Sequence, residues 1–248
     1  MAQHGKTPFD TTFSCVMFDF SGTLFRAEPA DTWLAAALAS CGLELPEVEQ
    51  LELRERLASC GIMPALGRGH QLELPPDLHS AWQQRNLDTR AHHEVFTALA
   101  RRAGLPDPGL AEALYRRHTH PQGWVPYPDV HKTLSELRDR GIPVAVVSNI
   151  GWDIRPLFAY REIPVDVFVL SCEHGIQKPD PRIFEIALQA LEREQSEALK
   201  ALKAMMVGDD PHTDGAATGS GADFYQVEHL PVDQRPDAIA AILSLPMA

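Results

Sequence analysis

Residues 14–24 read SCVMFDFSGTL, an apolar run that ends at Asp19 and passes into a polar turn containing glycine. Short, continuously apolar runs are typical of strands that are buried on both faces of a parallel sheet. We therefore predict a strand over Ser14–Phe20 and a turn over Ser21-Gly22-Thr23. Side chains just past the end of this strand become the first candidates for a functional site.

The rest of the chain has two different patterns. From about residue 29 to residue 118, apolar residues recur at helical spacing without a convincing strand, and Gly67-Arg68-Gly69-His70 is interpreted as a turn between helices. After residue 119, strands and helices alternate. The predicted strands are Ile142–Val147, Val165–Leu170, Ala204–Val207 and Ala222–Val227, and the predicted helices are Asp129–Arg140, Pro181–Glu194 and Arg235–Leu245.

Strand–helix alternation predicts an α/β fold with a doubly wound parallel sheet. Because the helical block lies between the first strand and the others, we expect it to be an all-helical cap inserted into the core. The predicted core comprises residues 1–28 and 119–248, and the predicted cap comprises residues 29–118.

Composition narrows the possible partners. The chain has 248 residues, 44% hydrophobic and 23% charged, as in ordinary globular proteins, and its net charge of −12 argues against nucleic-acid or anionic-membrane partners. No apolar run approaches the ~18 residues of a membrane-spanning helix, and the first ten residues lack the apolar core of a signal peptide. The four cysteines show no CxxC spacing, so we expect a cytoplasmic protein with reduced thiols and no structural zinc. The oligomeric state is left open.

The chemistry-bearing residues follow the predicted strands, where open parallel sheets bind their ligands. They are Asp19, Ser21, Gly22 and Thr23 after the first strand, Ser148 and Asn149 after the second, Lys178 after the third, and Asp209, Asp210 and Asp214 after the fourth. Gathered carboxylates repel one another unless a cation joins them, and oxygen ligands without Cys or His favour Mg²⁺. Lys178, Ser148 and the turn amides offer a place for phosphate. Together these groups indicate phosphoryl transfer, with a strand-end Asp as nucleophile.

The chain contains four motifs, DFSGTL (19–24), VVSN (146–149), QKPDPRIF (177–184) and VGDDPHTDGA (207–216). Their residues and their order resemble the haloacid dehalogenase superfamily of phosphatases and related hydrolases. The helical block also falls where many members carry a helical cap. The resemblance implies that the substrate is a small phosphorylated metabolite and the cofactor is Mg²⁺.

The same resemblance implies a role for each matching residue. Asp19 attacks phosphorus and ligates Mg²⁺, and the metal's other ligands are the Ser21 backbone carbonyl, Asp209 and Asp214. The phosphoryl group is bound by the turn at Gly22 and Thr23, by Ser148 with Asn149 nearby, and by Lys178, which neutralises both nucleophile and phosphate. Asp210 stands where the family often has a small polar residue, so its role is left open.

One departure from the family pattern leaves the activity open. Family phosphatases usually carry a second Asp, which acts as general acid and base, at the position of Ser21. A hydroxyl is a poor substitute, and losing such a group costs ~10²–10⁴-fold in rate. We favour a phosphatase that is slow, uses another group such as His212, or takes a substrate with a good leaving group.

Three alternatives remain. A dehalogenase-like hydrolase needs no acid, but family dehalogenases usually have Tyr at this position and lack the full acidic cluster. The others are a catalytically weak regulatory protein that binds Mg²⁺ and phosphate, and a phosphotransferase or phosphonate-cleaving relative. Arg26 and Glu28 fall where the cap hinge is expected and are candidates for gating or substrate contact. His92-His93 and His118-x-His120 lack partners spaced to complete a zinc site.

Overall fold

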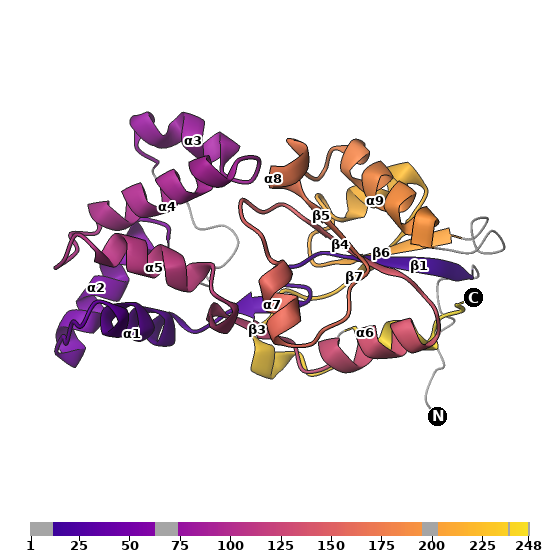
Figure 1. Cartoon of the computed structure of the whole chain (residues 1–248), viewed down its shortest axis with the longest axis horizontal. Coiled ribbons are helices and arrows are strands. Elements are labelled where there is room, and N and C mark those ends of the chain that lie inside the picture. The colour runs from indigo at the N-terminus through magenta and orange to yellow at the C-terminus, as the bar shows by residue number, and fades with distance from the viewer. Residues whose placement is uncertain (1–11, 63–73, 195–202, 238, 248) are drawn as a thin grey trace, which may run out of the picture.

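The computed structural model describes residues 12–62, 74–194, 203–237 and 239–247, and the segment Gly67–His70 lies outside them. Its central sheet has five parallel strands in the order β5-β4-β1-β6-β7 (Figure 1). The strands are β1 (Phe13–Phe18), β4 (Val144–Ser148), β5 (Val167–Leu170), β6 (Lys203–Gly208) and β7 (Asp223–Gln226). The prediction of an α/β fold with a parallel sheet is confirmed.

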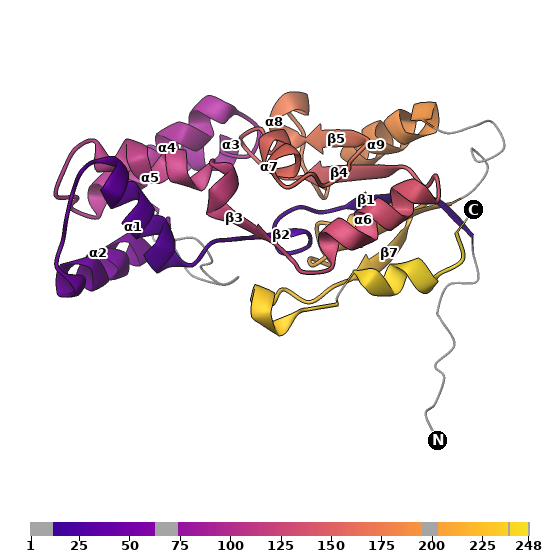
Figure 2. The same ribbon diagram turned by 60° about the horizontal axis from the view of Figure 1, so that its bottom comes forward.

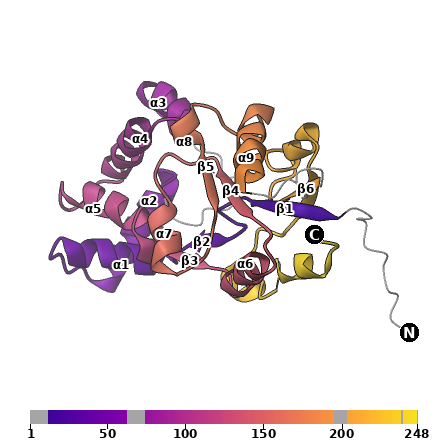
Figure 3. The same cartoon turned by 45° about the vertical axis from the view of Figure 1, so that its right-hand side comes forward.

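Strand β1 lies at the centre of the sheet because its whole sequence is apolar enough to be covered on both faces. All six of its residues are buried. Val16 and Phe18 belong to the core cluster shared with α6 (Val130–Asp139) and α7 (Arg155–Tyr160). On the opposite face, Met17 packs in the cluster that includes α9 (Pro181–Glu194), so α6 and α9 cover different faces (Figure 3).

The segment between β2 and β3 contains helices joined by loops, and no strand in the part that the structure describes. Its helices are α1 (Ala30–Ser40), α2 (Glu47–Ser59), α3 (His79–Gln84), α4 (Thr89–Arg102) and α5 (Leu110–His118). They share a cluster of buried residues separate from the two clusters of the sheet, and Figure 1 shows them beside the sheet as a distinct unit. We call this unit the cap.

A small antiparallel sheet, which the sequence did not predict, joins the cap to the core. It pairs β2 (Phe25–Ala27) with β3 (Trp124–Pro126), at the narrow part of the molecule (Figure 2). Three-residue strands are too short for a periodic pattern to identify. Beside this sheet, Nε and Nη2 of Arg117 each lie 2.5 Å from a carboxylate oxygen of buried Glu28. Glu28, one of the two predicted hinge residues, therefore links the segment that leaves β2 to the end of α5, just before the chain returns to the core through β3.

The predicted helix over Arg235–Leu245 is wrong. The structure has one short 3₁₀ turn in that range, Ala240–Ser244, and another, Val232–Gln234, just before it. A further short helix, α8 (Ser171–His174), follows β5. Arg235 precedes Pro236, and its backbone (φ −138°, ψ 72°) lies outside the helical region, which is disfavoured for a residue before proline. Among the described helices, none has the length and apolar character needed to cross a membrane.

Candidate active site

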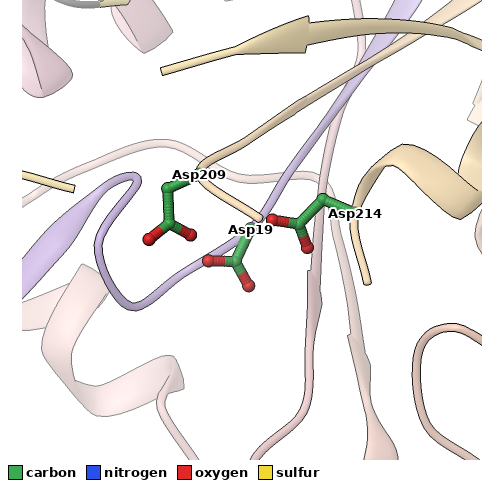
Figure 4. A group of neighbouring side chains, drawn as sticks. All are labelled: Asp19, Asp209 and Asp214. Atoms are coloured by element: carbon green, nitrogen blue, oxygen red, sulfur yellow. The ribbon is translucent and has the colours of Figure 1, made fainter. Parts of the chain in front are cut away.

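Loops at the carboxyl edge of the sheet bring together acidic residues that are far apart in the sequence. Asp19 follows β1, Asp209 follows β6, and Asp214 precedes the 3₁₀ turn Gly215–Ser220. Figure 4 shows the three side chains gathered at one place, and one carboxylate oxygen from each lies within 4.8 Å of the other two. All three residues are buried, so their charges interact through a medium that screens them weakly.

Lys178 lies against two of these carboxylates. Its Nζ atom is 2.6 Å from Oδ1 of Asp19 and 2.7 Å from Oδ1 of Asp214, and the residue is 2% exposed. The Asn149 amide holds the lysine backbone, since its Oδ1 accepts from Lys178 N at 2.7 Å and its Nδ2 donates to Lys178 O at 2.8 Å. The loop after β4 therefore fixes the position of the ammonium group.

The structure places the two predicted phosphate residues after β4 differently. Ser148 is the last residue of β4, is buried, and directly precedes Asn149, the residue that holds the Lys178 backbone. Both polar atoms of the Asn149 amide, by contrast, are hydrogen-bonded to the Lys178 backbone. The phosphate contact of Asn149 stays a prediction, and its geometry supports a positioning role.

The electrostatics of the cluster favour a shared cation. Burial, with smaller contributions from Asp214 and Asp209, raises the pKa of Asp19 to about 7, although Lys178 acts in the opposite direction. Burial alone lowers the pKa of Lys178, but the adjacent Asp19 and Asp214 outweigh it and raise that pKa. One ammonium group facing three buried carboxylates leaves a net negative site, which a divalent cation suits.

The donor set fits Mg²⁺. Three carboxylates, each offering an oxygen atom within a small space, are the hard ligands that this ion takes. Gly208 permits the arrangement, because a Cβ atom there would lie 2.3 Å from Oδ2 of Asp214. The same Oδ2 accepts a hydrogen bond of 2.9 Å from the backbone N–H of Asp210, which fixes the carboxylate.

The turn after Asp19 is tightly packed against the cluster. Gly22 has φ +95°, and a Cβ atom there would lie 2.4 Å from Nδ1 of His229 and 2.5 Å from Oδ2 of Asp209. The Gly22 N–H donates to Phe25 O at 2.8 Å, and the Thr23 hydroxyl donates to Oδ2 of Asp19 at 3.3 Å. Ser21 is exposed, unlike its neighbours in the turn. The turn therefore holds the Asp19 carboxylate and leaves the Ser21 position open to solvent.

His229 is a site residue that the sequence did not reveal. It follows β7, and its Nδ1 contacts Oδ2 of Asp209 while its Nε2 contacts Nη1 of Arg26. Arg26, predicted as a hinge residue, thus reaches the site through this histidine. A lone His in a loop after the last strand carries no motif, so only the fold brings it to Asp209.

Arg235 is a second residue that sequence analysis missed. It is 4% exposed, and its Nη1 donates to the carbonyl oxygens of Gly22 at 2.6 Å and Glu228 at 2.7 Å. Its Nη2 donates to the carbonyl of Thr23, and its guanidinium carbon lies 3.3 Å from the centroid of the Tyr127 ring. The C-terminal segment therefore clamps the turn that follows the predicted nucleophile.

Asp210 and His212 lie at the edge of the cluster. Oδ1 of Asp210 accepts from the backbone N–H of His212 at 2.8 Å, a local turn contact. The His212 side chain is exposed, and across the described residues no contact of its ring with the carboxylates is found. The suggestion that His212 replaces the missing acid gains no support from this placement.

A family model described as hydrolase, haloacid dehalogenase-like hydrolase, matches residues 13–218. The chain belongs to this family. The match spans β1 and the loops that carry Asp19, Lys178 and Asp214, which agrees with the resemblance seen in the four motifs.

Curated relatives of this haloacid dehalogenase-like hydrolase include several named phosphatases. The chain is 35% identical over 123 residues to phosphoserine phosphatase from Thermus thermophilus, covering 47% of this chain and 45% of that protein. It is 31% identical over 143 residues to ribulose-1,5-bisphosphate 5-phosphatase from Halopiger xanaduensis, covering 53% and 56%. Another match, acyl-CoA dehydrogenase family member 10 from Mus musculus, is covered over only 7% of its length. The chain therefore spans about half or less of these relatives.

Solved structures agree on the fold. A HAD-hydrolase from Bacillus subtilis, solved bound to magnesium, has a TM-score of 0.55 and 15% identity over 89% of this chain and 92% of its own. The defluorinating L-2-haloacid dehalogenase Rha0230 has the same TM-score with 21% identity, over 91% and 89%. Because both phosphatases and dehalogenases share this fold, it does not distinguish between the two chemistries.

Proposed function

We propose that the chain is a Mg²⁺-dependent hydrolase of small phosphomonoesters that works through an aspartyl-phosphate on Asp19. The observation that carries the proposal is the contact of Lys178 Nζ with both Asp19 and Asp214, beside a third carboxylate on Asp209. The three neighbouring carboxylates favour this proposal over the dehalogenase alternative, for which the sequence pattern predicts an incomplete acidic cluster. The names of the phosphatase relatives support the same reading.

In the proposed reaction, one carboxylate oxygen of Asp19 attacks phosphorus and the bond to the ester oxygen breaks. Lys178 neutralises the charge on the nucleophile and on the transferring phosphoryl group, and buried Ser148 donates a hydrogen bond to a phosphoryl oxygen. Water then attacks the aspartyl-phosphate, which releases inorganic phosphate and regenerates Asp19.

The cation's ligands in this proposal are Asp19, Asp209, Asp214 and the backbone carbonyl of Ser21. When bound, Mg²⁺ supplies positive charge that keeps the Asp19 carboxylate ionised and offsets charge on the phosphoryl oxygens. Asn149 positions Lys178, and the hydrogen bond from Thr23 orients the attacking carboxylate.

Ser21 restricts the substrates. Its hydroxyl cannot supply a proton near neutral pH, so the ester oxygen must leave with little help from that position. Substrates with a stable leaving group are therefore favoured. The cap, proposed to comprise residues 29–118 on a core of residues 1–28 and 119–248, excludes bulk water and selects the substrate. The net charge of −12 argues against nucleic acids and anionic membranes as partners, and a small anionic metabolite is compatible with it because Lys178 supplies local positive charge at the phosphate site.

The test is phosphate release from a panel of phosphorylated metabolites, with Mg²⁺ or with a chelator, and with a 2-haloacid as a control substrate. Metal-dependent phosphate release that disappears in Asp19→Asn supports the proposal, provided that the variant keeps its circular dichroism spectrum. Asp139→Asn, an exposed acid on α6, is the matched control and should retain full activity. Halide release without metal, or phosphate release that survives Asp19→Asn, would refute the proposal.

A further inference from the structure

A cavity of about 180 Å³ lies among the cap helices. Its walls include Trp82, Arg85, His92, Phe96 and His118. The volume corresponds to about six water molecules, enough for a short carbon chain with one polar end. The rest of the lining is glycine and aliphatic side chains, so one cation and two imidazoles stand in an otherwise apolar wall. Such a wall is typical of a pocket for a specific small ligand.

Within the described part of the chain, Arg85 has no acidic partner. Its Nη1 donates to Trp82 O at 2.7 Å, and its guanidinium carbon lies 4.0 Å from the centroid of the Trp82 ring, so the side chain is fixed in place. Burial lowers the pKa of the Arg85 guanidinium, and no carboxylate among the described residues offsets that cost. A partly desolvated cation that faces a cavity is a binding site for an anion.

The two imidazoles add neutral hydrogen-bonding groups. Burial lowers the pKa of His92 to about 4, with smaller contributions from the neighbouring Arg85 and His93. Burial, with a smaller contribution from His92, lowers the pKa of His118 to about 3. Each ring therefore offers one donor and one acceptor at neutral pH. His92 Nδ1 lies 3.2 Å from the Tyr115 hydroxyl, whereas within the described chain His118 makes ring contacts, such as 4.9 Å between centroids with Phe96, but no side-chain hydrogen bond.

Residues of the cavity wall contact the two loops of the proposed phosphate site, the loop that carries Asn149 and the loop that carries Lys178. A Cβ atom on Gly151, two residues after Asn149, would lie 2.0 Å from Arg85 O and 2.5 Å from Cβ of His92. The next cap residue, Asn86, donates from Nδ2 to Oε1 of Gln177 at 3.3 Å, beside Lys178. The wall therefore packs against the loops that carry Asn149 and Lys178, the residues of the proposed phosphate site.

We propose that the cavity receives the part of the substrate beyond the phosphate, and that this part is a short apolar chain ending in a carboxylate bound by Arg85. The inference rests on the proposed function and adds the substrate class. The planar guanidinium matches a carboxylate in two hydrogen bonds, and the small volume suits a carboxylate better than a second phosphate. Trp82 and Phe96 provide the apolar surface for the chain.

The test compares ω-carboxyalkyl phosphates of increasing chain length with the n-alkyl phosphates of the same length. In the wild type, at least one carboxylate compound should exceed its uncharged partner about tenfold in kcat/KM, the effect of one charge-assisted interaction. In Arg85→Gln this preference ratio should fall close to one, and Arg85→Lys should keep part of it. Arg102→Gln, an exposed arginine on α4 outside the cavity, should keep the full ratio.

Two results would overturn the inference: no preference at any length in the wild type, or a preference that survives Arg85→Gln in a folded variant. If none of these alkyl phosphates releases phosphate, the proposed function is still decided by the metabolite panel, because an alkoxide is a poor leaving group when no acid protonates it. The inference is then decided by calorimetric binding of the corresponding ω-carboxyalkyl and alkyl phosphonates, for which the same preference and the same loss in Arg85→Gln are expected.

Discussion

The Nζ atom of Lys178 lies 2.6 Å from Oδ1 of Asp19, although the two residues are 159 positions apart in the chain. The ammonium group is buried and stabilises the ionised carboxylate of the proposed nucleophile. It also separates Asp19 from Asp214, to which it makes a second contact.

We expect Lys178→Met to lower kcat/KM at least about 100-fold, because preorganised charge stabilisation of this kind is worth that much or more. The measurement is phosphate release from an aryl phosphate at saturating Mg²⁺, with circular dichroism to verify folding. Lys132→Met, an exposed lysine on α6, controls for loss of a charge. An activity within a few-fold of the wild type would remove Lys178 from its proposed role.

Ser21→Asp should increase the rate, because it restores a carboxyl group at an exposed position two residues after Asp19. We expect a gain of about 100-fold with phenyl phosphate and a smaller gain with 4-nitrophenyl phosphate, whose leaving group needs less protonation. Ser21→Asn, similar in size but unable to transfer a proton, should show no gain. An equal response of the two substrates, or of the two variants, would mean that proton transfer is not what the serine lacks.

Arg235→Ala should disturb the turn after Asp19, since the guanidinium binds the carbonyl oxygens of Gly22 and Thr23. We expect kcat to fall about 10-fold or more with little change in KM, because a positioning defect acts on the chemical step. Millimolar methylguanidinium should restore part of the lost activity by filling the same place.

A purely structural role for Arg235 predicts a different pattern, in which thermal stability falls but added methylguanidinium does not restore kcat. Tyr127→Phe is the matched control. It removes the hydroxyl that donates to Leu230 O at 2.6 Å but keeps the ring under the guanidinium, so we expect near wild-type kcat.

Acidification should destabilise the cap. The pKa of His118 is about 3 and that of His92 about 4 in the folded chain, against about 6.5 when unfolded. Between those values the unfolded chain binds protons that the folded chain does not, so stability falls as the pH drops below about 6.5 and the loss ends near the folded pKa values.

The expected slope is at most about 1.4 kcal/mol per pH unit for each histidine in that window. Urea unfolding at pH 7 and pH 5 measures it. His118→Phe should flatten the dependence, whereas His131→Gln, an exposed histidine on α6, should leave it unchanged. A dependence that is equally steep in His118→Phe would show that other groups cause it.

Local sequence was sufficient to predict most of the core. A run such as Ser14–Phe20 is apolar on both alternating faces, so it has a stable place only inside a covered sheet, and β1 occupies that place. The helix predicted over Pro181–Glu194 has the bounds of α9, because Asp180 and Pro181 mark its start. Asp19 and Asp209 directly follow strands β1 and β6, and parallel strands bring their carboxyl ends to one edge. Lys178 and Asp214 lie farther along the loops after β5 and β6, where the motifs identified them.

Only the tertiary structure decided what surrounds that edge. His229 and Arg235 belong to no motif. His229 contacts Asp209 and Arg235 contacts the Gly22 turn because the segment after β7 folds back over this edge of the sheet. Arg85 and His118 line a common cavity only because the cap helices pack together, so the sequence alone did not mark them as candidates for substrate binding. Periodicity and turn chemistry act over a few residues and fix the elements, whereas the meeting of distant side chains depends on how those elements pack.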